Sequence, residues 1–209
     1  RTGPAADGPQ SVTGGYDVLK STERLRNRVF SIVTDELRMP DGDVAERDYM
    51  RHVGSVGVVA LDAEDRVVLV RQYRHPLRRE IWELPAGLID VAGEPLVEAA
   101  ARELAEEVDL RAGRYDLLAD ANPSPGCSDE VIRLFLARDL SAVPAADRHH
   151  RTHEEAGMTV ERIRLDRAVG MVLGGEITNA AAMVGVLAAA EARARNWATL
   201  RPVDEPLPD

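Results

Sequence analysis

The sequence predicts an α+β fold, because segments with strand character outnumber the helical ones and surround a single amphipathic helix. Short segments rich in β-branched residues, or alternating between apolar and polar residues, are typical of strands. The central helix is expected at residues 95–108, with proline in its first turn, where the missing N–H is harmless. Two further helices are expected at residues 166–173 and 178–197. Strands, one central helix and terminal helices together indicate a layered domain.

The expected strands lie on both sides of the central helix. Residues 28–38 are rich in β-branched side chains, and a Pro-Asp-Gly turn at residues 40–42 separates them from a second strand at 44–49. Residues 53–61 are almost entirely apolar, as a strand covered on both faces would be. The remaining strands are expected at residues 67–73, 81–84, 115–120, 131–137 and 158–164.

The central helix separates apolar from acidic residues. At about 100° per residue, one stripe is apolar and faces the core. This stripe consists of Val97, Ala101, Leu104 and Val108. Glu103, Glu106 and Glu107 lie on the opposite side, where neighbouring like charges repel by about 0.2–0.5 kcal/mol per pair. A divalent cation bound by oxygen ligands would offset this repulsion. The alternative is a solvated acidic face braced by Arg102.

Composition limits the class of protein. A chain of 209 residues suits one domain with a small appended element, and a formal net charge of −10 argues against nucleic acid as a partner. The longest uncharged stretch, residues 177–190, is too short and too interrupted to span a membrane. Cys127 is the only cysteine, so we expect no intrachain disulfide and a cytoplasmic location.

Residues 87–110 resemble the Nudix box, G-x5-E-x7-R-E-U-x-E-E-x-G-U, where U is aliphatic. The matching residues are Gly87, Glu94, Arg102, Glu103, Leu104, Glu106, Glu107 and Leu110. There are two departures, because six residues rather than five separate Gly87 from Glu94, and Asp109 replaces the second glycine. We expect Asp109 to end the helix in the left-handed conformation, which Asp tolerates better than most residues.

The resemblance implies an α/β/α sandwich with a mixed sheet, preceded by a small N-terminal β segment. It also implies hydrolysis of a nucleoside diphosphate linked to another moiety, with Mg²⁺ or Mn²⁺ as cofactor. Glu103 and Glu107 would be the main metal ligands and Glu106 would lie near them. The carbonyl of Ala86 would complete the site, because the Pro-Ala-Gly sequence at 85–87 predicts an irregular backbone with an outward carbonyl. Glu94 is expected to hydrogen-bond the loop.

Two further segments resemble the ADP-ribose pyrophosphatase branch of this family. Arg74 matches an arginine that contacts substrate there, and Glu83 matches a nearby acid. The alternative for Arg74 is an ordinary surface charge. Pro125 stands at the spacing beyond the box that marks this branch, and Gly126 and Cys127 follow it as substrate-binding candidates. The alternative for this segment is a simple turn between strands, and Cys127 is interpreted as pocket lining rather than as a nucleophile.

The polar loop between residues 140 and 157 is interpreted as a binding loop or lid, with a disordered loop as the alternative. In the same branch, a glutamate from a mobile loop closes over the substrate and acts as general base or extra metal ligand. Glu154 or Glu155 would have this role here, and both stay candidates. His149, His150 and His153 raise the alternative of zinc, but the loop lacks a cysteine and a regular ligand spacing, which favours a solvated loop.

Together these features divide the chain into an unstructured lead-in at 1–15, an N-terminal β segment at 16–50, a Nudix domain at 51–198 and a loose tail at 199–209. The resemblance implies that the β segment is exchanged between the subunits of a homodimer. The expected activity is Mg²⁺-dependent hydrolysis of ADP-ribose to AMP and ribose 5-phosphate. Alternatives are GDP-mannose, another ADP-sugar or a dinucleotide as substrate, or a non-catalytic sensor of ADP-ribose. Neither a nucleic acid nor a membrane is an expected partner.

Overall fold

The structure is a computed structural model, and it describes residues 10–12, 14–151 and 157–208. The chain forms two compact units. The first unit contains Arg1–Val53 and Ser124–Glu130, and the second contains Gly54–Pro123 and Val131–Asp209.

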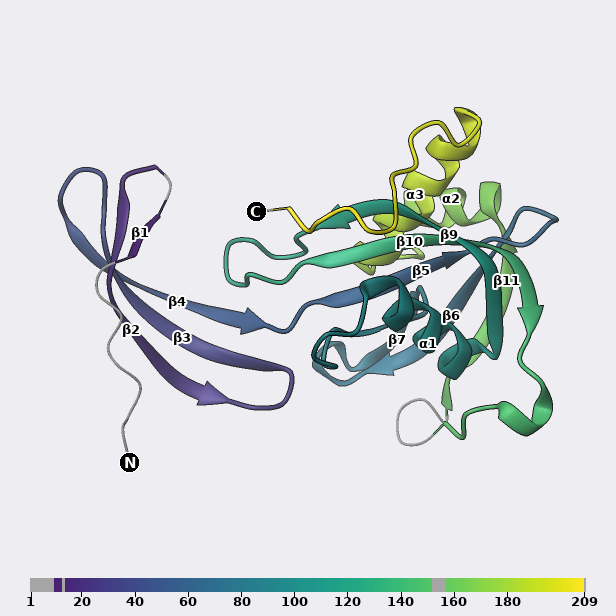
Figure 1. Cartoon of the computed structure of the whole chain (residues 1–209), viewed down its shortest axis with the longest axis horizontal. Helices are drawn as coiled ribbons and strands as arrows, with labels where there is room; N and C mark the ends of the chain where they lie inside the picture. The colour runs from purple at the N-terminus through teal and green to yellow at the C-terminus, as the bar shows by residue number, and fades with distance from the viewer. Residues whose placement is uncertain (1–9, 13, 152–156, 209) are drawn as a thin grey trace. The chain divides into compact units, whose positions relative to one another are not determined.

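The first unit is built on a four-stranded antiparallel sheet whose strands follow chain order, β1-β2-β3-β4. Its strands are β1 (Gln10–Val12), β2 (Tyr16–Arg26), β3 (Phe30–Arg38) and β4 (Val44–His52), the purple to blue strands of Figure 1. The sequence predicted β3 and β4 but not β2. The segment predicted as a lead-in, residues 1–15, contains β1, while residues 1–9 and 13 lie outside the described residues.

The second unit contains two sheets. One has the strand order β8-β5-β10-β9, with β5 and β10 parallel and the other pairs antiparallel, and the other has the order β11-β6-β7. Their strands are β5 (Ser55–Ala60), β6 (Arg66–Arg74), β7 (Arg79–Glu83), β8 (Ala86–Leu88), β9 (Leu110–Ala121), β10 (Ile132–Ala142) and β11 (Thr159–Arg164). The helices are α1 (Leu96–Val108), α2 (Leu165–Leu173) and α3 (Ala180–Ala194), with short 3-10 turns η1 (His75–Leu77) and η2 (Ala145–Asp147).

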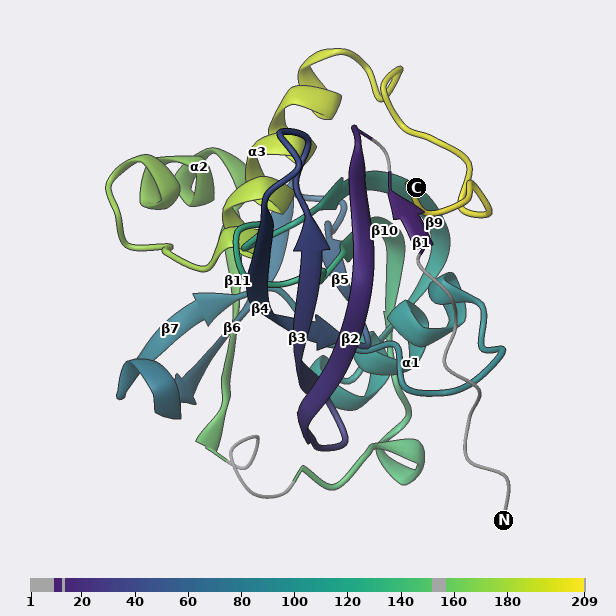
Figure 2. The same cartoon turned by 90° about the vertical axis from the view of Figure 1, so that its left-hand side faces the viewer.

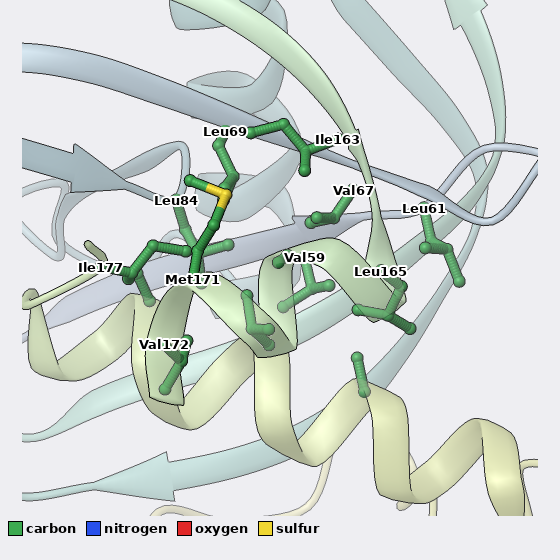
Figure 3. Packing of buried hydrophobic residues seen from close by; sticks show 14 of the residues in the cluster. Val59, Leu61, Val67, Leu69, Leu84, Ile163, Leu165, Met171, Val172 and Ile177 are labelled. Atoms are coloured by element: carbon green, nitrogen blue, oxygen red, sulfur yellow. The ribbon is translucent and has the colours of Figure 1, made fainter. Parts of the chain in front are cut away.

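Helices cover both faces of these sheets, as Figures 1 and 2 show. One buried cluster joins α2 and α3 to one face, where Val59, Leu69 and Met171 meet (Figure 3). A second cluster joins α1 to the other face, where Val58, Leu104 and Phe135 are fully buried. Alternate residues of β5 point to opposite clusters, which explains the nearly uninterrupted apolar sequence of this strand. The predicted α+β fold with a mixed sheet is confirmed.

The C-terminal segment is not the loose tail that the sequence predicted. The backbones of Arg201 and Leu117 exchange two hydrogen bonds of 3.0 Å, so the segment adds to the edge of β9. Arg133, only 2% exposed, donates to the carbonyl oxygens of Glu205 and Pro206. Its guanidinium also binds the carboxylate of Asp120, at 2.7 and 3.1 Å. In the described part of the chain, no helix has the length and apolar character that crossing a membrane requires.

Candidate active site

Glu103 of α1 lies directly over Gly87 of strand β8. A methyl group placed on Gly87 would come within 2.0 Å of Cδ and 2.2 Å of Oε1 of Glu103. No side chain fits this space, so residue 87 has to be glycine for Glu103 to keep its position. We call this close approach of the Glu103 carboxylate to the Gly87 backbone the Gly87 cradle.

Glu107 is buried, with 6% of its surface exposed, and its Oε2 accepts the backbone N–H of Ala86 at 2.9 Å. The hydrogen bonds between this segment and β5 use its odd-numbered residues, since the Val58 N–H donates to the Pro85 carbonyl and the Ile89 N–H donates to the Gly54 carbonyl. Ala86 lies between them in the alternation. In an antiparallel strand the N–H and C=O of one residue point the same way. The Ala86 carbonyl therefore points away from β5, toward the side on which Glu107 lies.

The irregular backbone predicted at residues 85–87 is wrong, because Ala86 and Gly87 belong to a short strand paired with β5. The outward carbonyl does not require an irregular backbone, since β8 is the edge strand of its sheet. The predicted apolar stripe of α1 is also corrected in part. Leu104 and Val108 are buried as expected, but Ala99 and Ala100 are buried in place of Val97 and Ala101. Glu107, expected on the side opposite the core, is buried as well.

Arg102 contacts three of the acidic side chains around α1. Its Nε and Nη2 each lie 3.1 Å from the carboxylate of Glu94, and its Nη1 lies 2.5 Å from Glu103 and 3.6 Å from Glu106. The hydrogen bonds to Glu94, followed by the charge of Glu103, raise the pKa of the Arg102 guanidinium above its ordinary value, although burial opposes them. The bracing role considered for Arg102 from the sequence is therefore present.

The residues around β8 suit a hard divalent cation by their chemistry. Among the residues that the structure describes, no three His, Cys, Asp or Glu side chains form a ready metal cluster. The Glu103 and Glu107 carboxylates and the Ala86 carbonyl are nevertheless all oxygen donors, the type that Mg²⁺ prefers. The Gly87 cradle and the Ala86–Glu107 hydrogen bond hold both carboxylates beside the same edge strand. The donor set and its placement fit such an ion.

The structure brings Arg74 and Glu83 together. The Arg74 guanidinium binds Glu83 through two hydrogen bonds of 2.8 and 2.6 Å, from Nε and Nη2. Gln72, which the sequence did not single out, donates to the same carboxylate at 3.1 Å. Glu83 is 3% exposed, so a buried acid orients an arginine whose side chain is about half exposed. Glu83 precedes Ala86 by three residues, which limits their separation to about 10 Å.

Pro125, Gly126 and Cys127 belong to the first unit, so the structure does not place them relative to α1. They form a turn in which the N–H groups of Cys127 and Ser128 both donate to the Ser124 carbonyl at 3.0 Å. Cys127 is exposed, and its carbonyl accepts the N–H of Met50 in β4. The substrate-binding role of this turn stays a prediction.

The two candidate general bases, Glu154 and Glu155, lie outside the described residues, as does His153. His149 and His150 are described and are exposed. The interpretation of the loop as a lid is therefore still a prediction.

Asp109 ends α1 as predicted, in the left-handed conformation with φ 56° and ψ 36°. Its Oδ2 accepts a hydrogen bond of 2.5 Å from Arg151, whose Nε also donates to the carbonyl of Glu106 at 3.2 Å. Arg151 was missed from the sequence. The signal for it was Asp109 itself, since a carboxylate at a position that usually lacks a side chain needs a partner.

Similarity to known proteins agrees with this geometry. A NUDIX domain model matches residues 51–172. The chain is 42% identical to an ADP-ribose pyrophosphatase from Mycobacterium tuberculosis, over 90% of this chain and 89% of that protein. It is 31% identical to an ADP-ribose pyrophosphatase from Bacillus subtilis, over 73% of this chain and 80% of the relative. A crystal structure of an ADP compounds hydrolase superimposes with a TM-score of 0.72 at 20% identity, covering 93% of this chain and all of that one, which supports the fold.

Proposed function

This chain belongs to the Nudix family of enzymes, and we propose that it hydrolyses the pyrophosphate of ADP-ribose to AMP and ribose 5-phosphate. The Gly87 cradle carries this proposal, because it holds the Glu103 carboxylate of the acidic helix against the edge strand β8. The carbonyl of the preceding residue, Ala86, points away from β5, toward the side on which Glu107 lies. The choice of ADP-ribose is supported by the two similar pyrophosphatases.

Nudix enzymes generally depend on divalent metal ions. We assign Mg²⁺, with Mn²⁺ as a substitute, to the carboxylates of Glu103 and Glu107 and the carbonyl of Ala86, with Glu106 nearby. When bound, the cation neutralises the charge of the pyrophosphate and lowers the pKa of the attacking water.

The remaining residues of the site bind, orient and balance charge. Glu83 presents the planar guanidinium of Arg74, which suits a phosphate group. Arg102 offsets part of the charge of Glu103 and Glu106. We further propose that Glu154 or Glu155 takes the proton of the attacking water. If a loop that closes over the substrate carries the base, the catalytic groups are complete only after the substrate has bound.

The proposal extends to the other parts of the chain. Pro125, Gly126 and Cys127 would line the substrate site. The strands β1 to β4 would be exchanged between the subunits of a homodimer. Size-exclusion chromatography with light scattering tests the dimer. We also keep the prediction of a cytoplasmic enzyme whose partner is a nucleoside diphosphate sugar.

Measurement of product release from a panel of nucleoside diphosphate compounds with Mg²⁺ tests the substrate. We expect AMP and ribose 5-phosphate from ADP-ribose, at a higher kcat/KM than for other compounds. Turnover of GDP-mannose, another ADP-sugar or a dinucleotide that equals or exceeds that of ADP-ribose would refute the assignment. Glu103→Gln is the control, and full activity of this variant would remove the metal assignment. Tight ADP-ribose binding without turnover would instead indicate a sensor.

Comparison of Glu154→Gln and Glu155→Gln at saturating substrate tests the base. We expect one variant to lose kcat by about 10²-fold or more while the other keeps most of it, since general base catalysis contributes about 10²–10⁴-fold. If neither variant loses kcat, neither glutamate is the base.

A further inference from the structure

The segment 143–151 is attached at both of its ends to the C-terminal turn of α1, and we call it the arm. At one end, the N–H of Val143 donates to the carbonyl of Asp109 at 2.9 Å. At the other end, Arg151 binds the Asp109 carboxylate and the Glu106 carbonyl, at 2.5 and 3.2 Å. Asp109 therefore holds both ends of the arm.

The second attachment depends on the residue that departs from the Nudix box. A glycine at position 109 would have no carboxylate to bind Arg151. The side chains of Asp109 and Arg151 are only 24% and 23% exposed, so this ion pair is better shielded from solvent than an ordinary surface pair. The arm is thus fixed, through Asp109, to the helix that carries the proposed metal ligands.

A cleft of about 420 Å³ lies between α1 and the arm. This volume falls in the range of small-molecule sites, roughly 300–1,000 Å³. The charged and polar side chains that line the cleft are Arg102, Glu106 and Arg111 from α1 and the following strand, and Asp147, Arg148, His149 and His150 from the arm. The lining includes Glu106, so the cleft adjoins the acidic face of the helix.

The cleft is lined by three arginines, two histidines and two carboxylates, so its charged lining is more basic than the chain as a whole, whose net charge is −10. Within the described residues, the hydrogen bond of Arg148 is to a neutral group, the Val143 carbonyl at 3.2 Å, and no carboxylate pairs with it. Arg111 is only loosely paired, 3.7 Å from Asp147. Two guanidinium groups therefore keep donors for a ligand, and His149 and His150 stand beside them.

We propose that this cleft binds a phosphate monoester, with Arg148 and Arg111 as the main contacts. The identity of the ligand rests on the proposed function, since both products of that reaction, AMP and ribose 5-phosphate, are phosphate monoesters. Guanidinium groups match phosphate oxygens through charge-assisted, bidentate hydrogen bonds. A product held here would lie beside Glu106 and would slow the next turnover.

Binding of inorganic phosphate to the metal-free protein, followed by ³¹P NMR titration, tests the cleft without any need for catalysis. The variant is Arg148→Ala, whose side chain is exposed, so the fold is expected to be unaffected. Arg167→Ala is the matched control, because Arg167 is an exposed arginine of α2 and lines no part of the cleft. We expect Arg148→Ala to weaken phosphate binding at least tenfold and Arg167→Ala to leave it unchanged. Equal binding in all three proteins, or no binding to the wild type, would overturn the proposal.

Product inhibition distinguishes the two monoesters. Inhibition constants for AMP and for ribose 5-phosphate are measured on the wild type and on Arg148→Ala, using as substrate a compound of the panel that the wild type hydrolyses. A rise of tenfold or more for one product identifies that product as the occupant, and unchanged constants for both would refute a product site. Failure of ADP-ribose as substrate, with phosphate binding intact, would refute the proposed function and leave the cleft standing.

Discussion

A single methyl group added at residue 87 should disturb the geometry of the candidate metal site and leave the stability of the fold nearly unchanged. In Gly87→Ala, the new methyl would lie 2.0 Å from Cδ and 2.5 Å from Cγ of Glu103. Carbon atoms in contact prefer about 3.5–4.0 Å, so the carboxylate has to move by roughly 1.5 Å or more. The backbone of residue 87 is in a region that alanine adopts without strain.

The cost to stability should be small, because the displaced atoms are at the end of a flexible side chain. A Glu103 side chain driven off its rotamer costs about 0.5–1.5 kcal/mol, and the gain from replacing glycine in a strand offsets about 0.5–1 kcal/mol of this. The effect on hydrolysis should be much larger, since a misplacement of about 1 Å in a catalytic site can lower the rate about 10²-fold.

The assay combines initial rates of ADP-ribose hydrolysis over a series of Mg²⁺ concentrations with thermal unfolding. We expect kcat to fall about 10²-fold and the Mg²⁺ concentration for half-maximal rate to rise, with Tm within a few degrees of the wild type. Gly170→Ala is the control, because no atom lies within 4 Å of a methyl group at this position of α2. Wild-type kcat and Mg²⁺ dependence in Gly87→Ala would refute the reasoning, and so would a loss of activity explained by unfolding.

Substitutions at three further positions test the site, the end of α1 and the anchor of the C-terminal segment. Glu107→Gln keeps an oxygen that can accept the Ala86 N–H, so we expect similar thermal stability but a loss of kcat of about 10²-fold or more, and wild-type kcat would show that the carboxylate charge is not needed. Asp109→Gly should be more stable to urea than Asp109→Ala by about 1 kcal/mol, since only glycine adopts φ 56° freely, and equal stabilities would contradict a left-handed helix end. Burial raises the pKa of the Asp120 carboxyl, but hydrogen bonds from Arg133 and Arg201 lower it by more. The pKa of Asp120 therefore lies below its ordinary value. The stability that ionised Asp120 contributes is therefore present above about pH 4 and lost as the pH falls through the lowered pKa. The stability of Asp120→Asn should change less with pH in that range than the stability of the wild type. Identical pH profiles of the two proteins would contradict this.

Local patterns in the sequence predicted what depends on near neighbours. Helix α1 was predicted from its 3.6-residue period, and the end of the helix at Asp109 from the backbone preference of one residue. Strand β5 was predicted from its continuous apolar sequence, because a strand buried on both faces needs little else. Strand β2 was missed since most of its residues are exposed, which leaves no apolar alternation to detect.

Contacts between distant residues decided the remaining features. Strand β8 has only three residues, and it is a strand because β5 pairs with it. The C-terminal segment has no apolar period, and its order comes from the buried Arg133, which binds the carbonyls of Glu205 and Pro206.

The sequence by itself determined the α+β class, the acidic helix and its left-handed end, because each follows from the preferences of adjacent residues. Only the tertiary structure decided that Glu103 lies over Gly87, that Glu107 accepts the Ala86 N–H and that Arg151 binds Asp109. These contacts join residues 16, 21 and 42 positions apart, so they form only when the core has brought their elements together. The glutamates could be named from the sequence, whereas their support could not.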